Sequence, residues 1–195
     1  MIDRSLIFKY FTQNVHDSKI YNHSIRVAEV AYNISRYLDV DENKIYCYGL
    51  LHDIGKITGS KGLRHVYAGY KILCEDNIID RPDICLTHSF PLKRAESYMG
   101  ENDCTEEEYH FIKNYIENIE YNLYDRIIQL SDAIAGSDGC MILEISMVKV
   151  AFKYKVNDHT INSWKEYFKI YDEIEKMLGV NVYSVLDQKV EGYNN

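Results

Sequence analysis

The chain has 195 residues, of which 46% are hydrophobic and 27% are charged, and its formal net charge at pH 7 is −8. This size and composition predict one globular domain with its own core, and the acidic balance argues against a protein that coats nucleic acid, because such binding depends on neutralising phosphates. Five scattered cysteines without C-x-x-C spacing, and no recognisable signal peptide or apolar run of about 20 residues, predict a cytoplasmic protein without disulfides, a Cys-based zinc site or a membrane segment.

Helical periodicity dominates the N-terminal part of the chain. A helix is predicted over the first dozen residues, with Asp17 or Ser18 as the cap of the next one. In "KIYNHSIRVAEVAYNISRYL", residues 19–38, apolar side chains recur with spacings of three and four, which is typical of a helix with one buried face. His23 belongs to this apolar stripe, so we expect its side chain to face the core.

The following predicted helix, residues 42–55, reads "ENKIYCYGLLHDIG" and is apolar on most sides. We expect it to stop at Gly55. His52 and Asp53 therefore end a buried apolar run, and burying such a pair is costly unless something compensates both groups. The segment "KITGSKGLR", residues 56–64, contains two glycines and is predicted to be a loop.

Two further histidines occur in the next helical patterns. A helix from about residue 64 to residue 75 contains His65 near its start. Asp80 followed by Pro82 is typical of a helix start, and the short helix that begins there brings His88 to its end.

The C-terminal half also has helical patterns and no run of alternating strand residues. The expected fold is therefore all-α, a single-domain helical bundle. We predict helices from a capping box at Thr105–Glu108 to Tyr121, over 124–136 with Asp132 inside, over 140–156 with the weakest pattern, and over 161–179 up to Gly179.

Four groups able to bind a metal thus lie on three separate core-facing segments: His23, the pair His52 and Asp53, and Asp132. Singly, each histidine could be a hydrogen-bonded core residue and each aspartate a helix cap. Jointly, they predict a buried divalent cation, because mixed nitrogen and oxygen ligands suit transition metals and facing helices can supply them.

The order of these residues, His23, then "LLHDIGK", then "LSDAIAG", resembles the H…HD…D signature of the HD-domain superfamily. The resemblance covers about residues 21–136, and we expect residues 137–195 to form C-terminal helices packed on that region. It implies an all-helical, metal-dependent phosphohydrolase that cleaves a phosphate ester or anhydride by attack of metal-activated hydroxide, without a serine or cysteine nucleophile.

His65, with a glycine four residues later, and His88 resemble the further histidines of HDIG-type members, which hold two ions. The resemblance implies that His23, His52, Asp53 and Asp132 hold one ion, that His65 and His88 hold a second, and that Asp53 bridges both. The alternatives are a solvated helix-start residue for His65 and a helix C-terminal cation for His88. Iron, manganese, nickel and zinc all suit such ligands.

The resemblance also implies catalytic roles for Asp53 and for Lys56, whose ammonium group is expected near the phosphate of the substrate. Lys61 and Arg64 continue a basic loop that could attract an anion. Arg26, one turn after His23, is a further candidate substrate contact, or the partner of an acid near the site. For each of the four basic residues, Lys56, Lys61, Arg64 and Arg26, the alternative is a side chain that is simply exposed to solvent.

The six-ligand order resembles that of small bacterial diadenosine tetraphosphate hydrolases, which implies a small anionic nucleotide substrate such as a diadenosine polyphosphate. HD-type 5′-deoxynucleotidases, with Glu where this chain has Lys56, and the HD-GYP phosphodiesterases are less similar. Two alternatives are a metal- and nucleotide-binding sensor or scaffold without turnover, and a structural metal site. The oligomeric state is left open, with a homodimer as one alternative.

Overall fold

The computed structural model describes residues 3–154 and 156–194, and within these ranges the chain forms nine α-helices and only two strands of two residues each. The all-α prediction is confirmed. None of the described helices is both long enough and apolar enough to cross a membrane. The helices are α1 Arg4–Asn14, α2 Ser18–Ser35, α3 Glu42–Leu51, α4 Arg64–Asp76, α5 Ile84–Thr87, α6 Glu106–Asn118, α7 Leu123–Ile134, α8 Leu143–Lys153 and α9 Thr160–Leu178.

Short polar side chains define where most of the N-terminal helices begin. The carboxylates of Asp3, Asp17 and Asp41 accept backbone N–H groups in the first turns of α1, α2 and α3. The predicted capping box of Thr105 starts α6, and Asn122 forms a second capping box at the start of α7. These caps satisfy N–H groups that a helix cannot bond internally.

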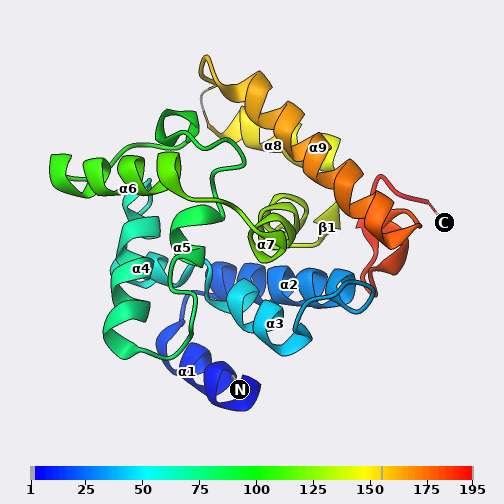
Figure 1. The fold of residues 1–195 in the computed structure, drawn as a ribbon, viewed down its shortest axis with the longest axis horizontal. Helices are drawn as coiled ribbons and strands as arrows, with labels where there is room; N and C mark the ends of the chain where they lie inside the picture. Colours follow the sequence, from blue (N-terminus) through cyan, green and yellow to red (C-terminus); the bar gives the residue numbers. More distant parts are fainter. Residues whose placement is uncertain (1–2, 155, 195) are drawn as a thin grey trace.

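Helix α7 lies at the centre of the molecule and is seen nearly end-on, with α2 and α3 on one side and α8 and α9 on another (Figure 1). Its apolar side chains Ile127, Ile128 and Ile134 are fully buried. Because neighbours surround α7 on several sides, a polar side chain on this helix must find a partner inside the protein. This requirement brings Asp132 into the site described below.

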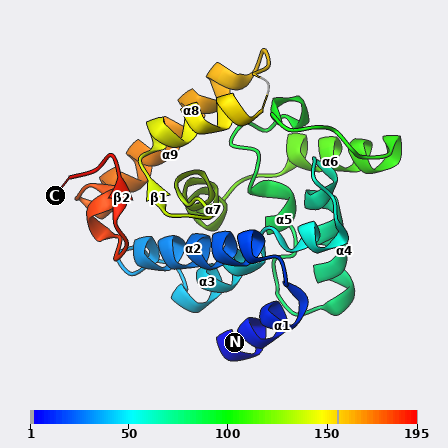
Figure 2. The same ribbon diagram turned by 180° about the vertical axis from the view of Figure 1, so that it is seen from behind.

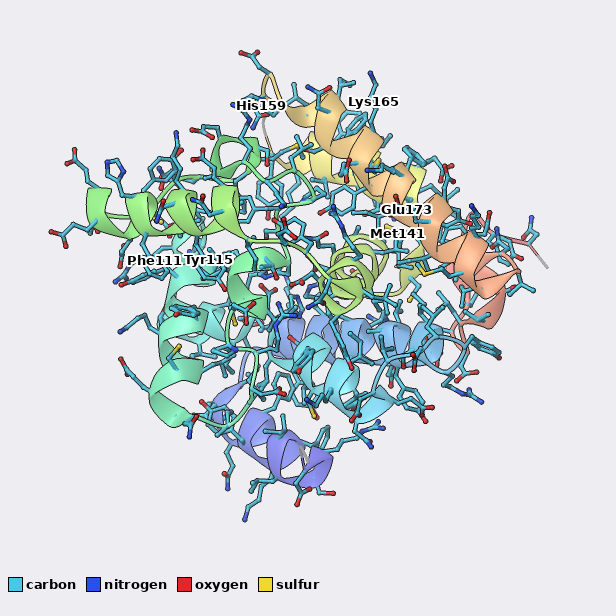
Figure 3. All side chains as sticks on the ribbon, viewed as in Figure 1. Phe111, Tyr115, Met141, His159, Lys165 and Glu173 are labelled. Carbon is cyan, nitrogen blue, oxygen red and sulfur yellow. The ribbon has the colours of Figure 1, made fainter. Side chains whose placement is uncertain are left out.

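Helices α4, α5 and α6 form a smaller apolar cluster beside α7. Aromatic rings join α4 to α6: the centroid of Phe111 lies 5.3 Å from that of Tyr67 and 5.5 Å from that of Tyr70. Phe111 and Tyr115 extend from α6 toward α4 (Figure 3). Helix α1 lies at the lower edge of the molecule and packs against α3 (Figure 2).

The structure corrects the helix predicted over 42–55. Helix α3 ends at Leu51, and after a turn the chain continues as a short 3₁₀ helix, η1 Ile54–Thr58. The chain reverses at Gly59, whose φ of 83° is left-handed, and not at Gly55. An apolar run cannot distinguish one long helix from two short ones, so the break was not visible in the pattern.

The C-terminal region holds the two strands, which the sequence did not predict. β1 Cys140–Met141 pairs in parallel with β2 Val190–Glu191 and joins the segment after α7 to the end of the chain. Two residues per strand are too few for a period-two pattern. Between them lie α8, which confirms the weakest predicted helix, and α9, which ends at Gly179 with a φ of 71° as expected.

Candidate metal centre

Six polar side chains, distant in the sequence, converge at the junction of α2, α3, α4, α5 and α7. All but His23 and Asp132 are nearly inaccessible to solvent. They are His23 in α2, His52 and Asp53 after α3, His65 in the first turn of α4, His88 at the end of α5 and Asp132 in α7.

The Asp53 carboxylate lies between two pairs of histidines. Its Oδ2 is 3.6 Å from Nε2 of His23 and 3.5 Å from Nε2 of His52. Its Oδ1 is 3.2 Å from Nε2 of His65 and 3.5 Å from Nε2 of His88. Each oxygen therefore faces a different half of the site.

Asp132 completes the first half. Its Oδ1 lies 2.9 Å from Nε2 of His23 and 3.4 Å from Nε2 of His52. In the second half, by contrast, Asp53 supplies the carboxylate that faces His65 and His88. The structure thus brings together all six side chains that the sequence predicted as ligands, in two sets that share Asp53.

All four imidazoles are oriented by a backbone carbonyl. A carbonyl oxygen only accepts hydrogen bonds, so Nδ1 carries the proton, and a neutral ring then has its lone pair on Nε2, toward the centre. The Nδ1 atom of His23 lies 2.9 Å from the oxygen of Ala135, that of His52 2.6 Å from Gly49, that of His65 2.7 Å from Gly62, and that of His88 3.3 Å from Ile84.

This arrangement fits cations better than it fits hydrogen bonding among the side chains alone. The two Nε2 atoms of His23 and His52 are 3.3 Å apart, and those of His65 and His88 are 3.4 Å apart. Two facing lone pairs repel unless a positive charge lies near both. Among the described residues, Oδ1 of Asp53 is buried and has no aligned hydrogen-bond donor. Imidazole nitrogens and carboxylate oxygens in this grouping suit divalent transition metals.

The close neighbours of the two carboxylates also shift their pKa values. Burial raises the pKa of Asp53, but Lys56 and His52 outweigh burial and hold it well below its usual value. Burial likewise raises the pKa of Asp132, and His23 and His52 lower it further than burial raises it. Both carboxylates are therefore ionised at neutral pH, as metal ligands must be.

Lys56 lies beside this centre. Its Nζ contacts Oδ2 of Asp53, and about a third of its side chain (34%) is exposed. Burial lowers the pKa of Lys56, whereas the neighbouring Asp53 raises it by more, so the ammonium group stays charged. A fixed positive charge thus lies between the buried carboxylate and the open space next to it.

That open space is a cavity of about 1110 Å³. Side chains of the predicted centre form its floor, among them Asp53, Lys56 and His65. The opposite wall comes from α8, α9 and the C-terminal segment. A ligand in the cavity could therefore contact the six-residue centre and this wall at the same time.

The structure does not place the other predicted substrate contacts in this cavity. Arg64 donates from Nε to the carboxylate of Glu108 (2.9 Å), and Lys61 is exposed on the loop. Arg26 donates from Nη1 to the carbonyl of Gly136 (2.7 Å), so it holds the backbone after α7 and not an acid. The two arginines are held away from the cavity by hydrogen-bond acceptors that are distant in the sequence. The pattern of charges along the sequence does not reveal such partners. The basic loop therefore gains no support as a route for the substrate.

Sequence reasoning missed several cavity residues. Lys153, Trp164 and Lys189 line the wall opposite the centre, and Lys19 and Tyr98 line its sides. None belongs to a recognisable motif. The one available signal was that the chain has a single Trp, and a lone aromatic residue on a helix is usually a core residue.

The comparisons with known proteins agree with the region delimited by the motifs. The family model described as HD domain matches residues 20–137, which is more than half of the chain. No curated protein and no solved structure matches the chain.

Proposed function

This chain belongs to the HD domain family, and on that premise we propose that it is a metal-dependent phosphohydrolase of the two-ion, HDIG type. The reaction is hydrolysis of a phosphate ester or anhydride. The observation that carries the proposal is the bridging position of Asp53, whose two oxygens each face a separate pair of histidine Nε2 atoms.

We propose that the donors form two coordination groups. One ion would be held by His23, His52, Asp53 and Asp132, and a second by Asp53 with His65 and His88; Fe, Mn, Ni and Zn all accept such ligands. When bound, such a pair of ions activates water and stabilises charge on the phosphoryl oxygens.

The chain's own residues supply the rest. The four backbone carbonyls that accept from Nδ1 orient the imidazoles before any ligand arrives, so little reorganisation is needed. Lys56 presents an ammonium group at the cavity and can pair with a phosphate oxygen of the substrate. The buried position of Asp53 keeps bulk water away from its carboxylate and strengthens its electrostatic interactions.

We propose a nucleotide as the substrate, with diadenosine polyphosphates among the candidates. A small anionic phosphate compound suits the charged floor of the cavity, and the acidic surface of the chain disfavours a polymeric nucleic acid.

The test is hydrolysis of a broad panel by protein purified without chelator. The panel contains p-nitrophenyl phosphate, bis(p-nitrophenyl) phosphate, nucleoside mono- to triphosphates and diadenosine tetraphosphate, each assayed with Mn²⁺, Fe²⁺, Ni²⁺ or Zn²⁺. We expect turnover that chelator abolishes and that Asp53→Asn lacks, while Asp172→Asn, an exposed change on α9, leaves it unchanged. If metal-loaded protein binds nucleotides but hydrolyses nothing in the panel, the sensor alternative replaces the enzyme.

A further inference from the structure

We propose that the wall of the cavity opposite the metal centre is a nucleoside-binding subsite, in which Trp164 stacks on the base while Lys153 and Lys189 bind phosphates. This inference rests on the proposed function for its substrate class. The residues concerned lie after residue 137, beyond the region that matches the HD domain model. The wall is therefore a feature of this chain that membership of the family does not supply.

Charge is the first argument. Lys19, Lys153 and Lys189 line the cavity, and within the described residues no carboxylate lies within 4.0 Å of their ammonium groups. A protein with a net charge of −8 thus concentrates unneutralised positive charge around one cavity. A local excess of positive charge on an acidic protein attracts an anion. Several lysines spread along a wall suit a chain of phosphates better than a single phosphate group.

Outside the metal centre the cavity lining carries two carboxylates, and one of them is already paired with a lysine. Glu191 lines the cavity, but its Oε2 lies 2.6 Å from Nζ of Lys149. Asp138, the other one, also lines the cavity and is exposed to solvent. The remaining carboxylates of the lining, Asp53 and Asp132, belong to the metal centre. Lys149 is thus already paired, whereas Lys153, whose Nζ lies 4.9 Å from the ring centroid of Tyr154, and Lys189 keep no carboxylate partner among the described residues and can bind a phosphate.

Aromatic surface is the second argument. Trp164, Tyr154 and Tyr167 come from α9 and the segment that precedes it, and all three line the cavity. Trp164 is half-buried, with part of its side chain packed on the core, so its position is fixed. Any of the nucleobases can stack on a fixed aromatic ring, because every base has a π face.

The third argument is an unsatisfied hydroxyl. Ser163, next to Trp164, lines the cavity with only 6% of its surface exposed, and its Oγ has no hydrogen-bond partner among the described residues. A buried hydroxyl without a partner is costly. A ribose hydroxyl or a base edge bound at Trp164 would supply that partner.

The size of the cavity agrees with an extended ligand. Pockets for small molecules usually span roughly 300–1000 Å³, and this cavity is about 1110 Å³. A bare phosphate monoester would fill only the floor. Figure 3 shows Met141 between α9 and α7, and Met141 and Lys56 line the same cavity. A nucleotide bound at the wall would therefore share one cavity with Lys56.

The single Trp of the chain makes a direct test simple, because its fluorescence reports on this wall alone. The holoprotein is titrated at low temperature with ATP, adenosine and tripolyphosphate, exciting near 295 nm. We expect saturable quenching by ATP, weaker quenching by adenosine, and competition by tripolyphosphate without quenching.

Lys153→Ala and Lys189→Ala should each weaken ATP binding roughly tenfold, because each variant loses one charge-assisted contact with a phosphate. Lys176→Ala, an exposed lysine in the last turn of α9, is the matched control and should bind as the wild type does.

A calorimetric titration covers the stacking role, since it does not need the Trp signal. Trp164→Leu should weaken ATP binding by roughly tenfold or more and Trp164→Phe by less, because Phe keeps an aromatic face. The proposal is overturned if ATP leaves the emission unchanged, or if the two lysine variants bind ATP as tightly as the control. Binding without hydrolysis would support the subsite and contradict the proposed enzyme. Metal-dependent hydrolysis of p-nitrophenyl phosphate without nucleotide binding would do the reverse.

Discussion

The backbone of Gly55 lies directly against the backbone of Gly69. A Cβ at Gly55 would come within 2.9 Å of the Cα of Gly69, and closer still to its amide nitrogen and to the carbonyl of His65. The 3₁₀ helix η1 and helix α4 therefore touch without intervening side chains. This contact sets the distance between Asp53, just before η1, and His65, at the start of α4.

Substituting Gly55 by Ala should force η1 and α4 apart. Backbone atoms cannot move aside as a flexible side chain would, so we expect destabilisation of about 3 kcal/mol, or roughly 6–12 °C in Tm. Scanning calorimetry measures this change. Gly139→Ala is the matched control, because a Cβ there would have no neighbour within 4 Å. Equal Tm values for the two variants would contradict the close-contact explanation.

Asp125 holds the segment that carries His88. It is fully buried, and its Oδ1 accepts from Thr87 (2.9 Å) and from Arg81 (3.0 Å). Arg81 would keep Asp83 as a partner (2.6 Å), but the buried hydroxyl of Thr87 would lose its acceptor, and losing a hydrogen bond to a charged group typically costs about 1.5–3 kcal/mol. Asp125→Ala should therefore lower the free energy of unfolding by that amount and weaken metal retention at the His65–His88 side.

Denaturant unfolding and metal analysis of the same Asp125→Ala sample separate these two effects. Asp125→Asn should lose less stability, because an amide oxygen can still accept from Thr87. Asp172→Ala, on the exposed face of α9, should behave as the wild type. A variant that loses stability yet keeps its full metal content would show that Asp125 stabilises the fold without positioning His88.

The pH dependence of the metal-free protein follows from His52. Burial lowers its pKa, but Asp53 and Asp132 outweigh burial and raise it above the ordinary 6.5. A raised pKa in the folded state contributes stability that is complete below the unfolded-state value and is lost as the pH rises through the folded-state value. Chelator-treated protein should therefore lose Tm as the pH rises above about 6.5.

Metal should remove that dependence, because a cation takes the place of the proton between His52 and the two carboxylates. Thermal melts of chelator-treated and metal-loaded protein across this range provide the comparison. A Tm that stays constant or rises with pH in the metal-free protein would contradict the assignment of a charged His52 in that state.

The contrast between Lys56 and Lys61 tests which part of the basic loop matters. Lys56 contacts Asp53 and lines the cavity, whereas Lys61 is exposed outside it. Lys56→Met should lower kcat by about 10²-fold, the usual effect of removing one preorganised charge, with metal content unchanged. Lys61→Met should stay within about twofold. Similar losses in both variants would restore the whole loop as a substrate contact.

Much of the site could be predicted from the sequence because local patterns specify it. The apolar stripe around His23 and the apolar run before His52 showed that both side chains turn inward, and the run "LSDAIAG" did the same for Asp132. Whether these side chains meet depends on the topology of the fold, and the resemblance to a known family predicted that they do. What the ligands do with metal stays a prediction.

Other features depend on contacts that no local pattern records. Gly55 looked like a helix stop, but it is glycine because α4 passes against it. Arg64 looked like a substrate contact, but Glu108, 44 residues later, engages it. Trp164 and Lys189 line the same cavity, and the pairing of β1 with β2 brings the end of the chain back to the segment after α7. Such pairings become visible only in three dimensions.

Metal content measured by elemental analysis, on protein purified without chelator, tests the bridging role of Asp53 most directly. We predict close to two transition-metal equivalents per chain in the wild type, close to one in His65→Ala, and close to none in Asp53→Asn, with Asp172→Asn as the wild-type control. Two equivalents in Asp53→Asn, or none in the wild type after loading with metal, would contradict a centre in which one carboxylate serves both halves.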